Sequence, residues 1–190
     1  RISVTDRCDF RCIYCMSEEM EFVPRAQLLT LEEISTIAHV FTLLGINKIR
    51  ITGGEPLIRK NVITLFNKLG SLDGLEELTT TTNGSQLMKL AIPLKEAGVN
   101  RINISLDSLK PDRFKRITRT GNLDKVLNGI DKALSVGFDK IKINTVILKN
   151  RNHDEIIDLV SFAVMKNIDI SFIEEMPLGL IDDHDRTEMY

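Results

Sequence analysis

Gly45-Ile-Asn-Lys-Ile-Arg-Ile51, Gly98-Val-Asn-Arg-Ile-Asn-Ile104 and Gly137-Phe-Asp-Lys-Ile-Lys-Ile143 repeat one pattern, in which a helical segment ends at a glycine and a short strand follows. A glycine just past a helix can adopt the left-handed conformation that satisfies the last helical carbonyls, and the apolar residue after it packs back on the last turn. These glycines therefore end helices and are not expected to bind phosphate. The repeat predicts a chain in which helices and strands alternate.

Elements of both kinds can be placed around these repeats. Residues 30–44 begin with a capping box formed by Thr30 and Glu33 and continue with an apolar face at helical spacing. Further helices are expected at residues 62–69, 87–97, 123–136 and 153–166, and strands at residues 2–5, 48–52, 77–82, 101–106, 140–147 and 169–174. Strands that alternate with helices favour a parallel sheet with right-handed crossovers.

The alternation of side chains within the strands indicates the kind of sheet. Lys48, Arg50 and Thr52 share one face of a strand and Ile49 and Ile51 the other, and the strands at 101–106 and 140–147 alternate similarly. An open sheet covered by helices on both faces would show continuous apolar runs, and a closed barrel would have an apolar interior. We therefore predict an α/β fold, an incomplete (βα)6 TIM-like barrel of parallel strands with a polar lining. An amphipathic sheet with its polar face in solvent is the alternative.

Length and composition fit one globular domain. The chain has 190 residues, of which 43% are hydrophobic and 27% charged, and its net charge of −2 gives no overall field that would attract nucleic acid or an anionic membrane. Neither a signal peptide nor an apolar run of about 18 residues is present. We expect residues 1–179 to form the partial barrel and residues 180–190 to begin a C-terminal region or linker, because the chain starts at Arg1 and ends in an acidic stretch.

The three cysteines of the chain, Cys8, Cys12 and Cys15, follow the first predicted strand with the spacing C-x3-C-x2-C. Thiolates are ligands of iron–sulfur clusters and of zinc, and such a group suits a reducing compartment such as the cytoplasm. A structural zinc site has four protein ligands, whereas a site with one open position is suited to bind an exogenous group. His39 is a weak candidate for a fourth ligand because it lies in a predicted helix. Chance clustering of three buried thiols is the remaining alternative.

The cysteine spacing, with Tyr14 directly before the last cysteine, resembles the signature of the radical S-adenosylmethionine (SAM) superfamily. Thr52-Gly53-Gly54-Glu55-Pro56 resembles the GGEP motif of the same enzymes. In that superfamily three thiolates hold a [4Fe–4S] cluster, whose fourth iron binds SAM, and reductive cleavage of SAM gives a 5′-deoxyadenosyl radical that abstracts hydrogen from the substrate. The resemblance implies that Cys8, Cys12 and Cys15 are the metal ligands and catalytic residues, because they hold the cluster that cleaves SAM. It also implies SAM contacts at Tyr14, Gly54, Glu55, Ser105 and Met176.

Residues 1–8, 50–59, 79–84, 103–109, 142–146 and 175–179 resemble one subfamily, the GTP 3′,8-cyclases, also called molybdenum cofactor biosynthesis protein A. These lyases cyclise GTP on the path to cyclic pyranopterin monophosphate. The resemblance implies GTP contacts at Arg1, Arg50, Thr81 and Lys142, and a second [4Fe–4S] cluster in a C-terminal region whose cysteines this chain lacks. It also implies an electron donor such as a flavodoxin, a cytoplasmic location and a state compatible with a homodimer.

The residues themselves agree with this resemblance in one respect. Arg50 and Lys142 share the polar phase of their strands, and Arg1 begins the first strand, so three cations can surround one cavity, as a triphosphate requires. Ion pairs with acidic neighbours such as Asp107 or Glu174 are the alternative use of these cations. Two further functions stay open, a radical SAM enzyme for another substrate, such as a peptide that it matures, and a non-enzymatic iron–sulfur or zinc module. The module would leave the GGEP motif unexplained.

Overall fold

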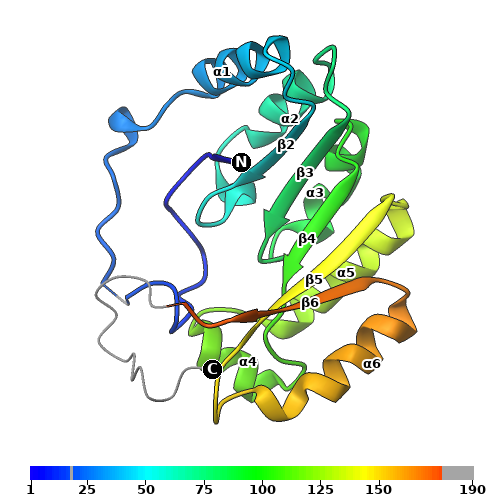
Figure 1. The fold of residues 1–190 in the computed structure, drawn as a ribbon. Coiled ribbons are helices and arrows are strands. Elements are labelled where there is room, and N and C mark those ends of the chain that lie inside the picture. Colours follow the sequence, from blue (N-terminus) through cyan, green and yellow to red (C-terminus); the bar gives the residue numbers. More distant parts are fainter. Residues whose placement is uncertain (18, 177–190) are drawn as a thin grey trace.

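The computed structural model describes residues 1–17 and 19–176, which contain one sheet of six parallel strands in the order β1-β2-β3-β4-β5-β6 (Figure 1). The strands are β1 (Ile2–Ser3), β2 (Lys48–Thr52), β3 (Glu77–Thr82), β4 (Arg101–Ser105), β5 (Lys140–Ile147) and β6 (Asp169–Glu174). Within the described residues the sheet is open, with β1 and β6 at its edges. The predicted α/β partial barrel is therefore confirmed, whereas its expected end at residue 179 and the segment 180–190 lie outside the described residues.

Helices connect the strands, and Figure 1 shows α2, α3 and α5 behind the sheet. The helices are α1 (Leu31–Leu43), α2 (Val62–Gly70), α3 (Leu87–Glu96), α4 (Pro111–Thr118), α5 (Leu123–Val136) and α6 (Ile156–Lys166), and short 3-10 turns are η1 (Arg25–Gln27), η2 (Pro56–Ile58) and η3 (His153–Glu155). The capping box of α1 is confirmed, because Thr30 and Glu33 exchange backbone-to-side-chain hydrogen bonds. No helix in the described part of the chain combines the length and apolar composition of a bilayer-spanning helix.

Most element boundaries lie within one residue of the sequence-based expectation, and the larger differences concern α4, the first strand and the segment at 153–166. The helix α4 was not expected, because it is only 8 residues long and its apolar side chains Phe114 and Ile117 are set in a highly charged segment. Its first residue is Pro111, whose fixed φ suits the first helical position. The first strand is shorter than expected, and the expected helix at 153–166 consists of the 3-10 turn η3 followed by α6.

The two faces of the sheet differ as the alternation predicts. The isoleucines of β2, β4 and β5 are nearly inaccessible and belong to the core; they are Ile49, Ile51, Ile102, Ile104, Ile141 and Ile143. The opposite, polar face carries two rows of paired residues, one through Arg50, Thr79, Arg101 and Lys140, the other through Thr81, Asn103, Lys142 and Asp169. Apolar burial under the helices thus leaves a polar surface on the other side of the strands.

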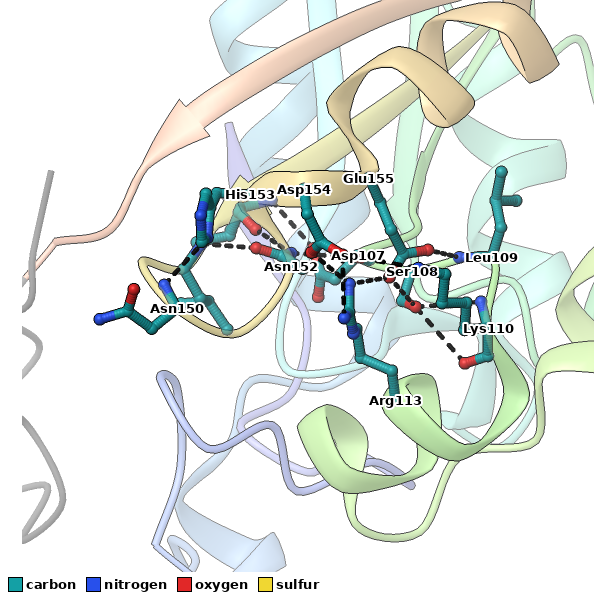
Figure 2. A network of polar contacts seen from close by, with 12 residues as sticks. Asp107, Ser108, Leu109, Lys110, Arg113, Asn150, Asn152, His153, Asp154 and Glu155 are labelled. Atoms are coloured by element: carbon teal, nitrogen blue, oxygen red, sulfur yellow. Dashed lines mark hydrogen bonds and ion pairs between the residues drawn. The ribbon is translucent and has the colours of Figure 1, made fainter.

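A buried carboxylate fixes α4 against the turn that follows β5 (Figure 2). The side chain of Glu155 is fully buried and accepts hydrogen bonds from the Ser108 hydroxyl at 2.8 Å and the Leu109 backbone N–H at 2.9 Å. Arg113 of α4 donates to the same carboxylate at 2.6 Å and to Asp154 at 2.5 Å. Because a buried charge is costly unless it is paired, this ion pair positions α4 beneath the segment that follows β1.

We expect Arg113→Ala to lower the free energy of unfolding by about 2 kcal/mol, because it removes a charged hydrogen-bond donor from a buried carboxylate. The measurement is a urea titration followed by circular dichroism. Arg116→Ala, at an exposed position of the same helix, is the matched control and is expected to change stability by less than about 0.5 kcal/mol. Equal losses of unfolding free energy in the two variants would show that the ion pair between Arg113 and Glu155 does not stabilise the fold.

Candidate functional site

The cluster loop, residues 5–16, follows β1 at the carboxyl edge of the sheet and contains the three cysteines. Arg11 and Ile13 donate backbone hydrogen bonds to the carbonyls of Thr118 and Ile117 at the end of α4, at 3.0 Å each. The ring of Phe10 packs edge-on against Phe114, with 5.9 Å between the ring centroids. The unexpected helix α4 is therefore the support on which the cluster loop rests.

All three thiols are free, with Cys8 and Cys12 partly buried and Cys15 exposed. Burial raises the pKa of Cys8 to about 11 and that of Cys12 well above its ordinary value, the latter with smaller contributions from Asp107 and from the other two cysteines. Within the described residues no three His, Cys, Asp or Glu side chains are arranged to hold a metal ion. The loop nevertheless carries three thiols at the spacing C-x3-C-x2-C, and thiol donors fit three ligands of an iron–sulfur cluster.

The GGEP loop, residues 52–56, packs its backbone directly on the cluster loop. Gly54 donates its N–H to the Thr5 carbonyl at 2.7 Å, and Glu55 donates to the Arg7 carbonyl at 2.8 Å. A Cβ atom on Gly53 would lie 2.5 Å from the Thr5 oxygen, and one on Gly54 would lie 2.4 Å from the Arg7 oxygen. The resemblance implies that Gly54 contacts SAM, and the structure shows that both glycines allow the close approach of the cluster-loop backbone.

The carboxylate of Glu55 holds the GGEP loop against the end of β3. It is fully buried and accepts hydrogen bonds from the Leu57 N–H at 2.9 Å, the Thr82 hydroxyl at 2.8 Å and the Asn83 N–H at 2.6 Å. Burial raises the pKa of Glu55 to about 7, although the three donors oppose this shift. In this structure the side chain therefore binds protein groups, and its charge lies just beneath the loop.

Tyr14 is anchored by a second buried carboxylate. Its hydroxyl donates to Asp107 at 2.7 Å, and Asp107 also accepts the Val146 N–H at 2.9 Å. Asn152 donates to the Asp107 carbonyl at 2.8 Å, in the same network as Glu155 (Figure 2). Burial raises the pKa of Asp107 to about 6. The alternative ion pair between Asp107 and a cation of the polar face is not observed, because the described contacts of Asp107 are with Tyr14 and the backbone.

The other expected SAM contacts lie along the same edge of the sheet. Ser105 is the last residue of β4, is paired with Asn144 and is partly exposed. Met176 follows β6 and is 59% exposed. Both positions leave their side chains accessible, and their contacts with SAM stay predictions.

The expected GTP contacts gather on the polar face. Thr81 and Lys142 occupy one paired row through Asn103, and Arg50 lies in the neighbouring row. Arg1 directly precedes Ile2, the residue of β1 that pairs with Ile51. Within the described residues, the Nε of Arg50 and the Nδ2 of Asn103 are buried without a hydrogen-bond partner. Buried donors are normally satisfied, so two unsatisfied donors on one face indicate a place for an acceptor-rich ligand. Asn103 was missed from the sequence, although its strand phase could have indicated it.

Comparison with known proteins decides the family. The model of the radical SAM superfamily matches residues 2–163. The chain belongs to the radical SAM superfamily. The GTP 3′,8-cyclases of Pseudomonas entomophila and Pseudomonas syringae pv. syringae are 58% and 60% identical to it over all 190 residues. The chain spans 57% of the length of each of these relatives.

Solved structures with low sequence identity share the radical SAM fold of this chain. Streptococcus suis SuiB bound to S-adenosylmethionine matches 99% of the chain and 42% of its own, with a TM-score of 0.80 and 21% identity. Methylornithine synthase (PylB) matches 98% of the chain and 58% of its own, with a TM-score of 0.71 and 16% identity. At these identities the likeness concerns the fold alone.

We expect Gly54→Ala in this radical SAM chain to prevent stable loading of iron, because the added Cβ would meet the Arg7 carbonyl and push the cluster loop away. Iron content after anaerobic reconstitution is the measurement. Gly137→Ala is the control, because it meets no atom within 4 Å and strains only a positive φ of 79°, at a cost of about 1 kcal/mol. Full iron loading of Gly54→Ala would show that the tight contact between the two loops is dispensable.

Proposed function

We propose that this radical SAM protein is a GTP 3′,8-cyclase, a lyase that starts the cyclisation of GTP towards cyclic pyranopterin monophosphate in molybdenum cofactor biosynthesis. The proposal is supported by curated relatives of that name, which are 57–60% identical over the whole chain. The observation that carries it is the placement of the cluster loop and the GGEP loop at the edge of a sheet whose polar face has cations and unsatisfied donors.

The cofactor site is proposed on the cluster loop. Cys8, Cys12 and Cys15 would hold three irons of a [4Fe–4S] cluster, which supplies the electron that cleaves SAM to methionine and the 5′-deoxyadenosyl radical. The residues proposed to bind SAM are Tyr14, Gly54, Glu55, Ser105 and Met176. Since the Glu55 carboxylate already accepts three hydrogen bonds, its proposed part in SAM binding is to fix the GGEP backbone.

The substrate site is proposed on the polar face. Arg1, Arg50 and Lys142 would bind the triphosphate of GTP, because guanidinium and ammonium groups form charge-assisted hydrogen bonds with phosphate oxygens, and Thr81 would add a hydroxyl. Within the described residues no ion pair involves Arg1, Arg50 or Lys142, so these cations are available for such a ligand. Asn103, unsatisfied at Nδ2, lies in the same paired row as two of the proposed contacts.

The proposed partners and location follow the same family. A reduced flavoprotein such as a flavodoxin would deliver the electron, a second [4Fe–4S] cluster would lie in a C-terminal region, and the protein would work in the cytoplasm, where grouped free thiols are kept reduced. A homodimer is compatible with this function. Peptide maturation is the weaker alternative, because the likeness to SuiB, which has also been solved bound to the precursor peptide SuiA, extends only to the fold. Superfamily membership disfavours a non-enzymatic module.

We expect the protein at its natural length to consume GTP and to form 5′-deoxyadenosine in step when it is reconstituted anaerobically with iron, sulfide, reductant and SAM. Chromatography of the quenched reaction measures both compounds. Cys12→Ala should abolish the consumption of GTP and the formation of 5′-deoxyadenosine, because a thiolate ligand is lost. Formation of 5′-deoxyadenosine at the same rate with and without GTP would overturn GTP as the substrate while leaving the radical SAM chemistry in place.

Arg50→Ala should weaken GTP binding about tenfold or more, because it removes a charge-assisted hydrogen bond worth about 1.5–3 kcal/mol. Calorimetric titration with GTP measures the affinity, and the iron content should stay at the wild-type level. Arg116→Ala removes the same charge from an exposed position on α4 and should leave the affinity unchanged. If the two variants bind GTP equally well, Arg50 is not a phosphate contact.

A further inference from the structure

Asn83 connects the cluster loop with the GGEP loop. It directly follows β3 and is 9% exposed. Its backbone N–H donates to Glu55 at 2.6 Å, as described above, while its side-chain Nδ2 faces the cluster loop. There the Nδ2 donates to the Asp9 carboxylate at 2.7 Å and lies 3.7 Å from the Cys8 sulfur, within hydrogen-bond range for sulfur. One residue thus contacts a buried acid of one loop and a thiol of the other.

The side chain of Asn83 makes contacts beyond those that an ordinary turn requires. The Oδ1 of Asn83 accepts the Ser85 N–H at 2.9 Å, which is an Asx turn that an aspartate or a serine could also form. The contacts with Asp9 and with the Cys8 sulfur need the two N–H donors of an amide, which neither aspartate nor serine provides. The turn alone therefore does not account for this side chain.

The contact with Asp9 is shared with another side chain, whereas the Cys8 sulfur accepts from Asn83 and from the Phe10 backbone N–H at 3.4 Å, a donor that a side-chain substitution leaves in place. The Ser85 hydroxyl donates to the other oxygen of the Asp9 carboxylate at 2.6 Å, and the Thr120 hydroxyl donates to the Asp9 carbonyl at 2.7 Å. Within the described residues, Asn83 is the one side chain that donates a hydrogen bond to the sulfur of Cys8. Ser85 and Asn83 can therefore be compared directly, since only one of them contacts a proposed cluster ligand.

We infer that Asn83 is a positioning residue of the proposed cluster, which orients Cys8 and tunes the reduction potential of the cluster through an N–H···S hydrogen bond. This inference rests on the proposed function. Hydrogen bonds to the sulfurs of an iron–sulfur cluster stabilise the added negative charge after reduction, so they raise its potential. Because the same residue holds Glu55, Asn83 also ties the cluster ligand to the loop proposed to bind SAM.

The test is a redox titration of the SAM-responsive electron paramagnetic resonance signal in wild type, Asn83→Ser and Ser85→Ala, each at natural length. Serine at position 83 keeps the turn acceptor and neutral charge but is too short to reach the sulfur. We expect Asn83→Ser to shift the midpoint potential to more negative values and Ser85→Ala to remain close to wild type. Asn83→Ala, which removes turn and donor together, should shift it in the same direction.

Two results would overturn the inference and leave the proposed function standing. One is a midpoint potential of Asn83→Ser equal to that of wild type, and the other is an equal shift in Ser85→Ala, which would assign the effect to Asp9. Iron content and far-ultraviolet circular dichroism provide a second readout, since loss of iron by a folded Asn83→Ser supports the positioning role. A wild-type protein without a SAM-responsive signal would instead refute the proposed function itself.

Discussion

The two backbone hydrogen bonds between the GGEP loop and the cluster loop are the contact on which the site depends. Gly54 and Glu55 donate to Thr5 and Arg7, and only glycine at positions 53 and 54 permits this approach. The contact forms because β1 and β2 are parallel neighbours, with Ser3 paired to Thr52, so both loops leave the sheet at the same edge. Parallel pairing thus brings together two motifs that lie about forty residues apart in the sequence.

Buried carboxylates fix the rest of this edge. Glu55 joins the loops after β2 and β3, Asp107 joins the end of β4 to β5 and to Tyr14, and Glu155 joins the segment before α4 to η3. Each carboxylate accepts at least one backbone N–H, which compensates part of the cost of burying it. A neutral amide could fill the same space, but it has one acceptor oxygen, whereas a carboxylate has two and can accept more donors. The carboxylates therefore preorganise the loops before any cofactor binds.

The regular elements were predictable because their signals are local. Alternating isoleucines gave the strands and their two faces, and the Thr30 capping box gave the start of α1. The helix α4 was not predictable, since its stability comes from Phe114 packing on Phe10 and from Arg113 pairing with Glu155, which are contacts between distant segments. The spacing of the cysteines identified the proposed cluster loop. Its supports could not be found in this way, because Asn83 lies 75 residues from Cys8 and Asp107 lies 93 residues from Tyr14.

The polar face favours one class of ligand over another on energetic grounds. A buried donor without a partner costs about 1–3 kcal/mol, so the free donors of Arg50 and Asn103 are a cost that a suitable ligand can remove. A peptide segment without acidic side chains offers neutral carbonyls, which supply less negative charge to Arg50, Lys142 and Arg1. A triphosphate offers both the acceptor oxygens and the negative charge, because its oxygens accept several charge-assisted hydrogen bonds at once. This comparison supports the proposal of a nucleoside triphosphate over that of a neutral peptide.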